Sequence, residues 1–488
     1  MKISVKVLSG LLILAIIIAG CAKHQGAGAV SPPVTPPPDS STGPVGSPDV
    51  AFYLTKADGS VLFKPQNQRL MFGNTGSGGL TILVDSTKTY QTIDGFGYAF
   101  TGGSAYLINR MPTTDRDALL KELFLTDSNR IGVSYLRVSI GASDLSANVF
   151  SYDDAGSPAA PDTNLAQFDL SADRYDLIPV LKQILALAPG IKILGSPWSA
   201  PLWMKSNNNS VGGTLLPGYY DVYARYFVRY IQAMKAEGIP IDAVTPQNEP
   251  MNPLNNPSMT LTAEQEADFV KNHLGPAFQA AGITTKIIAF DHNCENPGYP
   301  LAVLGDADAR NFLDGSAFHL YGGDISALTQ VHNAYPSKNV YFTEQWVGGP
   351  SHFGGDLGWH VKNLIIGAPR NWSRNVLEWN LANDPDYQPH TQGGCGNCLG
   401  ALTIGASVSR NVSYYIIAHA SKFVRPGSVR VDSNIPGSLQ NVAFVTPDGK
   451  KVLIVLNDSG GQQAFNIQFK GKIVQVSLDG GAVGTFVW

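Results

Sequence analysis

The sequence predicts an α/β protein: a (β/α)8 barrel, the TIM barrel, with a small attached β-sandwich formed by N- and C-terminal strands. Over about 300 residues of the 488-residue chain, strand-like apolar runs alternate with helix-like runs, and eight such strands can close into a parallel barrel. On either side, residues 49–89 and 421–488 contain strand-like segments with no helix-length pattern between them. We therefore expect the barrel over residues 90–420 and a β-domain built from the two flanking segments.

The composition fits a globular protein with a sizeable core, since 44% of the residues are hydrophobic and 15% are charged. The net charge of −4 gives no indication of a nucleic-acid partner. Aromatic residues make up 10% of the chain, which suits either stacking on sugar rings or the packing of a large core.

The N-terminus has the features of an export signal. Lys2 and Lys6 precede an apolar run over residues 8–18, and two small residues and Cys21 follow it. The run is too short to favour a membrane-spanning helix. A cysteine directly after small residues resembles the bacterial lipobox, in which the cysteine becomes the mature N-terminus and carries the lipid.

We accordingly expect residues 1–20 to be a lipoprotein signal peptide and Cys21 to be the lipid attachment site. Residues 21–48 are rich in Pro, Gly and Ser and should form a tether. The protein would then be exported and held at a bacterial membrane, at the cell surface or on the periplasmic face. An ordinary signal peptide, cleaved elsewhere, is the alternative.

The strand-like segments before the barrel are residues 50–54, 60–63 and 81–89. The eight candidate barrel strands are mostly apolar and several are β-branched, as expected of strands buried on both faces. They cover residues 92–97, 134–140, 191–196, 241–246, 286–290, 315–320, 340–344 and 375–379.

Helix candidates lie between most of these strands, and the clearest covers residues 219–237, ending before Gly238. One stripe of this segment, at helical spacing, is aromatic and apolar, which predicts core packing and not a sugar-binding surface. The stripe consists of Tyr219, Tyr223, Tyr226, Phe227, Tyr230 and Met234.

The C-terminal region has four strand-like runs, and Asp448-Gly449 is a hairpin signal just before the first of them. The runs cover residues 452–456, 465–469, 473–478 and 485–488.

In a (β/α)8 barrel the active site lies at the C-terminal ends of the strands. Nearly every candidate strand here is followed by a polar group or an aromatic ring. These segments are Phe96-Gly97, residues 137–144, Ser196-Pro197-Trp198, Gln247-Asn248-Glu249-Pro250, Asp291-His292-Asn293, His319-Leu320-Tyr321, Thr343-Glu344-Gln345-Trp346 and Glu378-Trp379-Asn380. Carboxylates and amides bond hydroxyl groups and aromatic rings cover C–H faces, so the pattern indicates a buried, polyhydroxylated ligand.

Two of these segments carry a glutamate at the end of an apolar strand, Glu249 after the fourth and Glu344 after the seventh. Glycoside hydrolysis needs two carboxyl groups that flank the scissile bond, one protonated and one ionised, and a separation of about 5–5.5 Å gives retention of configuration. Asn248 could bond the sugar 2-hydroxyl, and Pro250 restricts the backbone of Glu249. A solvated or salt-bridged glutamate is the alternative for either position.

Three segments together resemble glycoside hydrolase family 30, the family of lysosomal glucosylceramidase and of bacterial and fungal β-1,6-glucanases. They are Asp94-Gly95-Phe96-Gly97, the ten residues from Ser196 to Lys205, and Gln247-Asn248-Glu249-Pro250. The resemblance covers roughly residues 50–488. It implies a (β/α)8 barrel with attached β-structure, a retaining mechanism, and no cofactor or metal.

The resemblance also implies roles for individual residues. Glu249 corresponds to the acid/base and Glu344 to the nucleophile. Asn248 matches the amide on the 2-hydroxyl, and Asp144 and Trp198 match residues that bind the outer hydroxyls of the non-reducing sugar.

Trp379 matches the aromatic residue beneath the sugar ring, and Tyr321 matches a tyrosine near the nucleophile. Arg137 is expected beside Glu344, where its fixed charge would keep that carboxyl ionised, although a purely structural ion pair is the alternative. His319 could bond a hydroxyl or the nucleophile, or be a satisfied core histidine.

The three cysteines of the folded part are Cys294, Cys395 and Cys398. A single C-x-x-C without a second pair does not favour zinc, so Cys395 and Cys398 form either a local disulfide or two free thiols. Cys294 would then be unpaired. The C-x-x-C belongs to a long loop after the eighth strand, which should shape the leaving-group side.

We therefore expect a retaining β-glycosidase that acts on a β-linked glucan or glucoside. The glucose-binding set and the anchor favour an endo-β-1,6-glucanase over a glucosylceramidase, β-glucosidase or β-xylosidase of the same family. The alternative from another class is a non-catalytic, surface glycan-binding lipoprotein, which would not require the two glutamates.

Overall fold

The structure, a computed structural model, describes residues 49–76 and 78–488. The expected signal peptide (residues 1–20), Cys21 and the expected tether (residues 21–48) lie outside the described residues. Within the described part of the chain, no helix is both long and apolar enough to cross a membrane.

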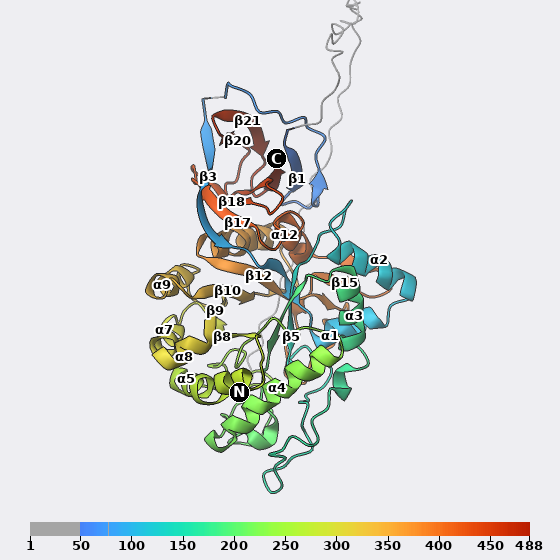
Figure 1. The fold of residues 1–488 in the computed structure, drawn as a ribbon. Helices are drawn as coiled ribbons and strands as arrows, with labels where there is room; N and C mark the ends of the chain where they lie inside the picture. Colours follow the sequence, from blue (N-terminus) through green and yellow to red (C-terminus); the bar gives the residue numbers. More distant parts are fainter. Residues whose placement is uncertain (1–48, 77) are drawn as a thin grey trace, which may run out of the picture. The chain divides into compact units, whose positions relative to one another are not determined.

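Eight parallel strands close into a barrel, which confirms the predicted (β/α)8 fold (Figure 1). In order round the barrel they are β4 (Gly95–Ala99), β5 (Tyr135–Ser139), β6 (Lys192–Ser196), β7 (Ala243–Val244), β8 (Lys286–Asn293), β9 (Leu313–His319), β10 (Asn339–Glu344) and β12 (Ser373–Asn380). The sequence locates these strands because most of them contain an apolar run that is buried on both faces.

Seven of the eight strands contribute one side chain each to a packed layer inside the barrel. The layer consists of Tyr135, Leu194, Ala243, Ile288, Ala317, Tyr341 and Leu377. The interior is therefore filled by side chains, and a ligand can enter only at an end of the barrel.

Helices follow most of the strands and cover the outside of the barrel. The α-helices are α1 (Gly102–Asn109), α2 (Thr113–Phe124), α3 (Leu177–Leu187), α4 (Tyr220–Ala236), α5 (Ala263–Phe269), α6 (Gly275–Ala280), α7 (Gly298–Gly305), α8 (Ala307–Phe312), α9 (Ala327–Ala334), α10 (Phe353–His360), α11 (Ala368–Arg370) and α12 (Val412–Ser421). The π-helical segments are η4 (Val270–Leu274) and η5 (Val361–Gly367), and the 3-10 turns are η1 (Ser171–Asp173), η2 (Leu202–Met204) and η3 (Pro217–Tyr219). The aromatic stripe predicted on α4 packs in the core, with only Tyr219 partly exposed.

Five short strands lie in the loops at the end of the barrel. They are β11 (Val347–Gly348), β13 (Ala382–Asn383), β14 (Cys398–Leu399), β15 (Leu402–Ile404) and β16 (Val408–Arg410). β11 pairs with β14, so the loop after β10 is held against the long loop after β12.

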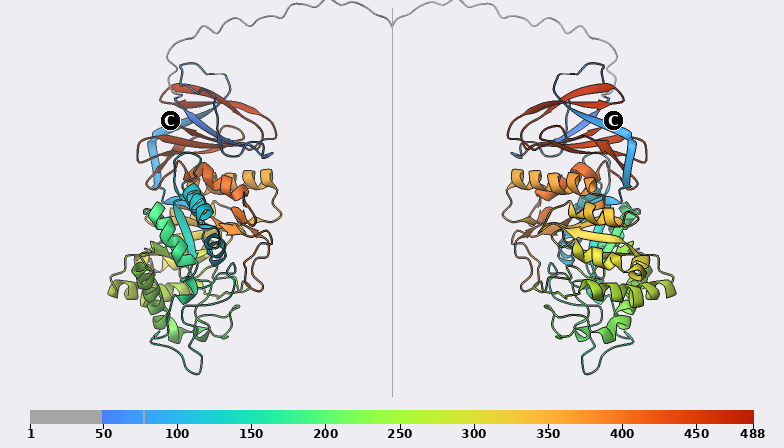
Figure 2. Two further views of the ribbon diagram at one scale, coloured as in Figure 1. Left: turned by 90° about the vertical axis from the view of Figure 1, so that its right-hand side faces the viewer. Right: turned by 90° about the vertical axis from the view of Figure 1, so that its left-hand side faces the viewer.

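The remaining strands form the β-sandwich domain, drawn in blue and red in Figures 1 and 2. They are β1 (Ala51–Thr55), β2 (Lys64–Pro65), β3 (Leu80–Thr92), β17 (Val429–Ser433), β18 (Leu439–Val445), β19 (Lys451–Asn457), β20 (Gln463–Phe469), β21 (Lys472–Leu478) and β22 (Val483–Val487). N-terminal β1 pairs with C-terminal β22, and the rings of Phe52 and Phe486 stack with centroids 4.6 Å apart. Both ends of the described chain therefore build one domain, as predicted.

Two expected strand boundaries were wrong. Residues 60–63 are not part of a strand, and the strand is instead Lys64–Pro65, paired with β1. β3 continues to Thr92 because its second half pairs with β17, so the first barrel strand begins only at Gly95.

Gly97 is required by the packing of β4 against β5. A Cβ atom at this position would overlap the backbone carbonyl oxygen of Tyr135. We expect Gly97→Ala to lower the free energy of unfolding by about 1–3 kcal/mol, the usual range for overpacking, measured by chemical denaturation. The control is Gly190→Ala, where a Cβ has nothing within 4 Å. A Gly97→Ala variant as stable as the control would contradict this packing.

Candidate active site

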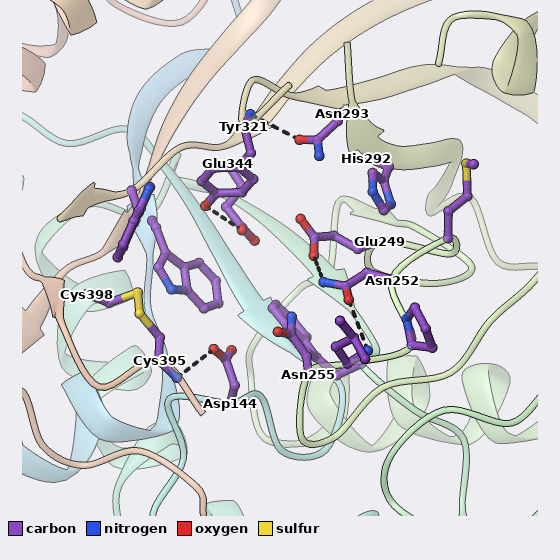
Figure 3. Close-up of a pocket in the computed structure, with 16 residues that line it drawn as sticks. Asp144, Glu249, Asn252, Asn255, His292, Asn293, Tyr321, Glu344, Cys395 and Cys398 are labelled. Carbon is purple, nitrogen blue, oxygen red and sulfur yellow. Dashed lines mark hydrogen bonds between the residues drawn. A yellow bond between two sulfur atoms is a disulfide. The ribbon is translucent and has the colours of Figure 1, made fainter. Parts of the chain in front are cut away.

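A cavity of about 680 Å³ opens at the C-terminal ends of the barrel strands (Figure 3). Its wall combines carboxylates, amides, aromatic rings and a disulfide. The lining residues are Asp144, Trp198, Glu249, Met251, Asn252, Pro253, Leu254, Asn255, His292, Asn293, Tyr321, Glu344, Trp346, Trp379, Cys395 and Cys398. This mixture suits a polyhydroxylated ligand with apolar C–H faces.

Glu249 follows β7 and has an uncommon backbone conformation. Its φ is 44°, in the left-handed region that few non-glycine residues adopt. Its backbone N–H donates to the carbonyl oxygen of Asp291 in β8, at 3.0 Å. The neighbouring strand thus holds Glu249 in place, with its carboxyl group on the cavity wall.

Glu344 is the last residue of β10, and two donors hold its carboxylate. Arg137 Nη1 donates to Oε2 at 2.6 Å, and the Tyr321 hydroxyl donates to Oε1 at 2.8 Å. Charge-assisted bonds of this length fix the orientation of the group.

The carboxyl groups of Glu249 and Glu344 lie close together. One oxygen of Glu249, one oxygen of Glu344 and one ring nitrogen of His319 all lie within 4.8 Å of one another. This spacing fits the retaining geometry of about 5–5.5 Å and not the wider separation of about 6.5–9.5 Å that leaves room for a water molecule.

Arg137, on β5, is a fully buried cation at the centre of the site. Its Nη2 donates to Asp291 Oδ2 at 2.7 Å and to Asn248 Oδ1 at 2.6 Å. Asp291 also accepts from the hydroxyls of Thr245 and Thr343, at 2.8 and 2.6 Å. The guanidinium therefore links two carboxylates and the amide next to Glu249 in one network.

His319, the last residue of β9, is also fully buried. Its Nδ1 lies 3.1 Å from Glu249 Oε1 and 3.8 Å from Glu344 Oε1, and its Nε2 lies 3.1 Å from Asp291 Oδ1. The ring thus lies among three carboxylates.

Arg137 and His319 contact carboxylates in this structure, and a contact of either residue with substrate stays a prediction. Both lie behind the carboxylates and outside the cavity lining, so their contacts are with Glu249, Asp291 and Glu344. Asn248 lies beside Arg137, and its contact with a sugar hydroxyl stays a prediction.

The charges around His319 decide where a proton of this cluster lies. Burial alone would lower the pKa of His319, but Glu344, Asp291 and Glu249 outweigh it and raise that pKa to about 9. Burial would raise the pKa of Glu249, but the hydrogen bond and charge of His319 lower it to about 2. These two shifts favour a proton on the imidazole of His319 over a proton on Glu249.

The charge of Arg137 is one of several influences on the pKa of Glu344. Burial raises the pKa of Glu344 above its ordinary value, while the charges of His319 and Arg137 oppose that rise. The nearby negative charge of Glu249 adds to it. Glu344 consequently becomes ionised at a higher pH than an ordinary glutamate.

Asp144 and the disulfide form one side of the cavity. Cys395 and Cys398 are bridged with an S–S distance of 2.06 Å, which decides between the two possibilities that the sequence left open. The backbone N–H of Cys395 donates to Asp144 Oδ2 at 3.4 Å. Burial, followed by the charges of Glu344 and Glu249, raises the pKa of Asp144 to about 7, so near neutral pH it can donate or accept a hydrogen bond. Cys294 is unpaired and buried.

Trp198 and Trp379 form an aromatic wall next to the disulfide. Their rings stack with centroids 5.3 Å apart, and the Arg137 guanidinium lies 4.7 Å from the Trp198 ring. The predicted residues Asp144, Trp198, Tyr321 and Trp379 therefore line the same cavity as the two glutamates.

Sequence reasoning assigned no role to Asp291 or Asn252. Asp291 stands at a strand end and could have been considered as a carboxylate partner for Arg137. Asn252 Nδ2 donates to Glu249 Oε2 at 2.8 Å, a contact that depends on a turn the sequence analysis did not consider.

Among the described residues, one group of three potential metal ligands lies close enough to hold an ion: Glu249, His319 and Glu344. The charges around it do not suit a cation, because the Arg137 guanidinium is bonded to Glu344 and the proton of His319 lies between carboxylates.

The described part of the chain is similar to known proteins along most of its length. Residues 93–424 match the Glycosyl hydrolase family 30 TIM-barrel domain, and residues 427–486 match the Glycosyl hydrolase family 30 beta sandwich domain. An Endo-1,6-beta-D-glucanase from Neurospora crassa is 34% identical over 455 residues, covering 87% of this chain and 92% of the fungal protein.

Lysosomal acid glucosylceramidase from Mus musculus is 29% identical over 447 residues, covering 85% of this chain and 84% of the mouse protein. The solved structure of the endo-beta1,6-glucanase BT3312 has a TM-score of 0.84 and 36% identity, covering 91% of this chain and 99% of that one.

The protonation of His319 can be measured directly. We expect its imidazole to stay charged until the pH approaches about 9, because three carboxylates hold the proton. His419 is a buried control, with a pKa lowered to about 3 by burial, so it should be neutral throughout. Nitrogen NMR of histidine-labelled protein, with single His→Asn variants for assignment, distinguishes the two forms. A neutral His319 at pH 7 would contradict the proposed charge arrangement.

Proposed function

Because the chain belongs to glycosyl hydrolase family 30, we propose that it cleaves internal β-1,6 bonds of a β-glucan with retention of configuration. The observation that carries this proposal is the pair of buried carboxyl groups, Glu249 and Glu344, at retaining distance on one cavity wall. The linkage is supported by the Neurospora crassa relative and by BT3312, both named for β-1,6-glucan.

The first step forms a covalent glycosyl-enzyme. An oxygen of Glu344 bonds to the anomeric carbon while the bond from that carbon to the leaving oxygen breaks, and Glu249 gives its proton to that oxygen. In the second step Glu249, now ionised, takes a proton from water, and the water oxygen displaces Glu344 from the anomeric carbon. Both glutamates return to their starting states.

Arg137 and Tyr321 prepare Glu344 for attack. Their hydrogen bonds, at 2.6 and 2.8 Å, hold one oxygen each, so the carboxylate cannot rotate away from the anomeric carbon. Such preorganisation reduces the cost of reaching the reactive geometry.

The proton for the first step comes from His319. Its Nδ1 lies 3.1 Å from Glu249 Oε1, so a short transfer turns the ion pair into a neutral imidazole and a carboxylic acid. A substrate that displaces water from the cavity favours this neutral pair, because charges are less stable in a drier environment.

The sugar bound next to Glu344 would lie against the aromatic wall of Trp198 and Trp379. Asp144, at the side of this wall, would bond its outer hydroxyls, and Asn248 its 2-hydroxyl, as the family resemblance implies. The substrate-binding roles of these four residues are part of the proposal.

The leaving group would lie over residues 251–255, which follow Glu249 and line the cavity. Met251 is 45% and Leu254 79% exposed, so this side is open and partly apolar. The opening favours a continuing glucan chain. Because apolar side chains also suit a lipid, and the mouse relative is a glucosylceramidase, a lipid-linked glucoside is the second candidate.

Incubation of the purified full-length protein with β-1,6-glucan tests the proposal. We expect early release of oligosaccharides of several lengths, resolved by size, because an endo-acting enzyme cuts within the chain. Glu344→Gln and Glu249→Gln should each lower turnover by at least about 10³-fold while the protein stays folded by circular dichroism. A Gln side chain has almost the same volume as Glu, but its amide group can neither ionise nor act as an acid.

Glucosylceramide and an aryl β-xyloside serve as comparison substrates. Turnover of glucosylceramide alone would favour the lipid-linked glucoside. Turnover of the xyloside alone would show that the enzyme acts on xylosides and not on glucosides. Glucan binding without product would favour a glycan-binding lipoprotein instead.

We also propose that the protein is exported and anchored to a bacterial membrane by a lipid on Cys21. The support is the sequence of residues 1–21, with its two lysines, short apolar run and terminal cysteine. A glucanase held in this way would act on polymer outside the cytoplasm.

The anchor can be tested by expressing the full-length chain in bacteria. Wild-type protein should partition into the detergent phase of Triton X-114, because acyl chains contribute about 0.8 kcal/mol per buried CH₂. Cys21→Ser should move to the aqueous phase, whereas Cys294→Ser, a change at a buried cysteine of the folded part, should not. Wild-type protein in the aqueous phase would contradict the anchor.

A further inference from the structure

The loop that follows Glu249 brings a side chain back onto its carboxyl group. The backbone N–H of Asn252 donates to the carbonyl oxygen of Glu249 at 2.8 Å, which closes a β-turn over residues 249–252. Pro250 occupies the second position of this turn, where its fixed φ is favoured. The turn places the Asn252 side chain next to Glu249 Oε2, 2.8 Å from Nδ2 (Figure 3).

The hydrogen-bond network settles which end of the Asn252 amide faces Glu249. The backbone N–H of Leu254 can only donate, and it lies 3.0 Å from Asn252 Oδ1. The oxygen of the amide is therefore directed to Leu254, and the nitrogen, which can only donate, is directed to Glu249.

The two oxygens of Glu249 have different partners. Oε2 accepts from Asn252, and Oε1 lies 3.1 Å from His319 Nδ1. That same nitrogen is 3.8 Å from Glu344 Oε1, so it lies near one oxygen of each glutamate. Oε1 is therefore the Glu249 oxygen that we expect to face a glycosidic bond held between the two carboxyl groups.

We propose that Asn252 is a positioning residue that directs the catalytic proton of Glu249 to Oε1. This rests on the proposed function of Glu249 as acid/base. A proton on Oε2 would weaken the bond from Asn252, while a proton on Oε1 keeps it. Asn252 and His319 also hold the carboxyl from both sides, so its plane stays fixed through both chemical steps.

The proposal predicts a dependence on the leaving group. A glucose leaving group needs a proton in the first step, whereas 2,4-dinitrophenolate is stable enough to leave without one. Loss of Asn252 should therefore slow the first step for a glucan and leave it nearly unchanged for the dinitrophenyl compound. A residue needed only for loop structure would affect both substrates.

The experiment compares kcat/KM for a β-1,6-linked glucotriose and for 2,4-dinitrophenyl β-gentiobioside, which share the same non-reducing disaccharide. Because kcat/KM covers only the steps up to formation of the glycosyl-enzyme, hydrolysis of that intermediate does not enter the comparison. For Asn252→Ala we expect a loss of about tenfold or more on the triose, part of the 10²–10⁴-fold typical of acid–base catalysis, and less than about threefold on the aryl substrate.

Asn252→Asp provides a second measurement that does not require loop disruption. Aspartate has the same shape and can still accept from Leu254, so the turn is kept. Its negative charge next to Glu249 should make the Glu249–His319 pair hold its proton more tightly. The pH at which kcat/KM falls on the alkaline side, the alkaline limb of its pH profile, should therefore rise by about one unit or more.

Asn255 supplies the matched control, since it lines the same cavity from the same loop (Figure 3). Asn255→Asp should move the alkaline limb by less than Asn252→Asp, because it is Asn252 that donates to Glu249 Oε2. Equal losses on both substrates for Asn252→Ala, or an unmoved limb for Asn252→Asp, would overturn the role of Asn252. A wild-type protein that cleaves neither substrate would instead overturn the proposed function.

Discussion

The buried guanidinium of Arg137 is the interaction on which the site depends. It is fully buried, and it pairs with Asp291 and Glu344 at 2.7 and 2.6 Å. Removing a charge from water is costly, so a buried cation persists only with close, well-aligned partners. Here those partners include Glu344, the proposed nucleophile. One buried charge thus both stabilises the carboxylates and orients the one that we propose to react.

The barrel makes this arrangement possible because it places the ends of distant segments side by side. Arg137 comes from β5, Asp291 from β8, His319 from β9 and Glu344 from β10, and all four meet at one end of the closed sheet. The close approach of these charged side chains also determines which of them is protonated. With several carboxylates around one imidazole, the proton is held by His319, and Glu249 receives it only when the surroundings become less polar.

The fold could be predicted closely because it depends on patterns that are local in sequence. Apolar runs gave the barrel strands, and the family motifs gave the residues that line the cavity. The segment over residues 60–63 was misplaced because a two-residue strand such as β2 has no pattern of its own. The contact of Asn252 with Glu249 depends on the geometry of one turn, and the roles of Arg137 and His319 depend on the burial of side chains. The charge balance at Glu249 likewise depends on a distant contact, because His319 lies 70 residues further along the chain.

The central claim is that Glu344 forms a covalent bond to the substrate while Glu249 handles the proton. A 2-deoxy-2-fluoro β-glucoside with a dinitrophenyl leaving group slows the second step, so the intermediate accumulates and can be located by mass spectrometry of peptides. The account predicts a fluoroglucosyl group on the peptide that contains Glu344. A label on Glu249, or product of inverted configuration with no labelled peptide, would contradict it.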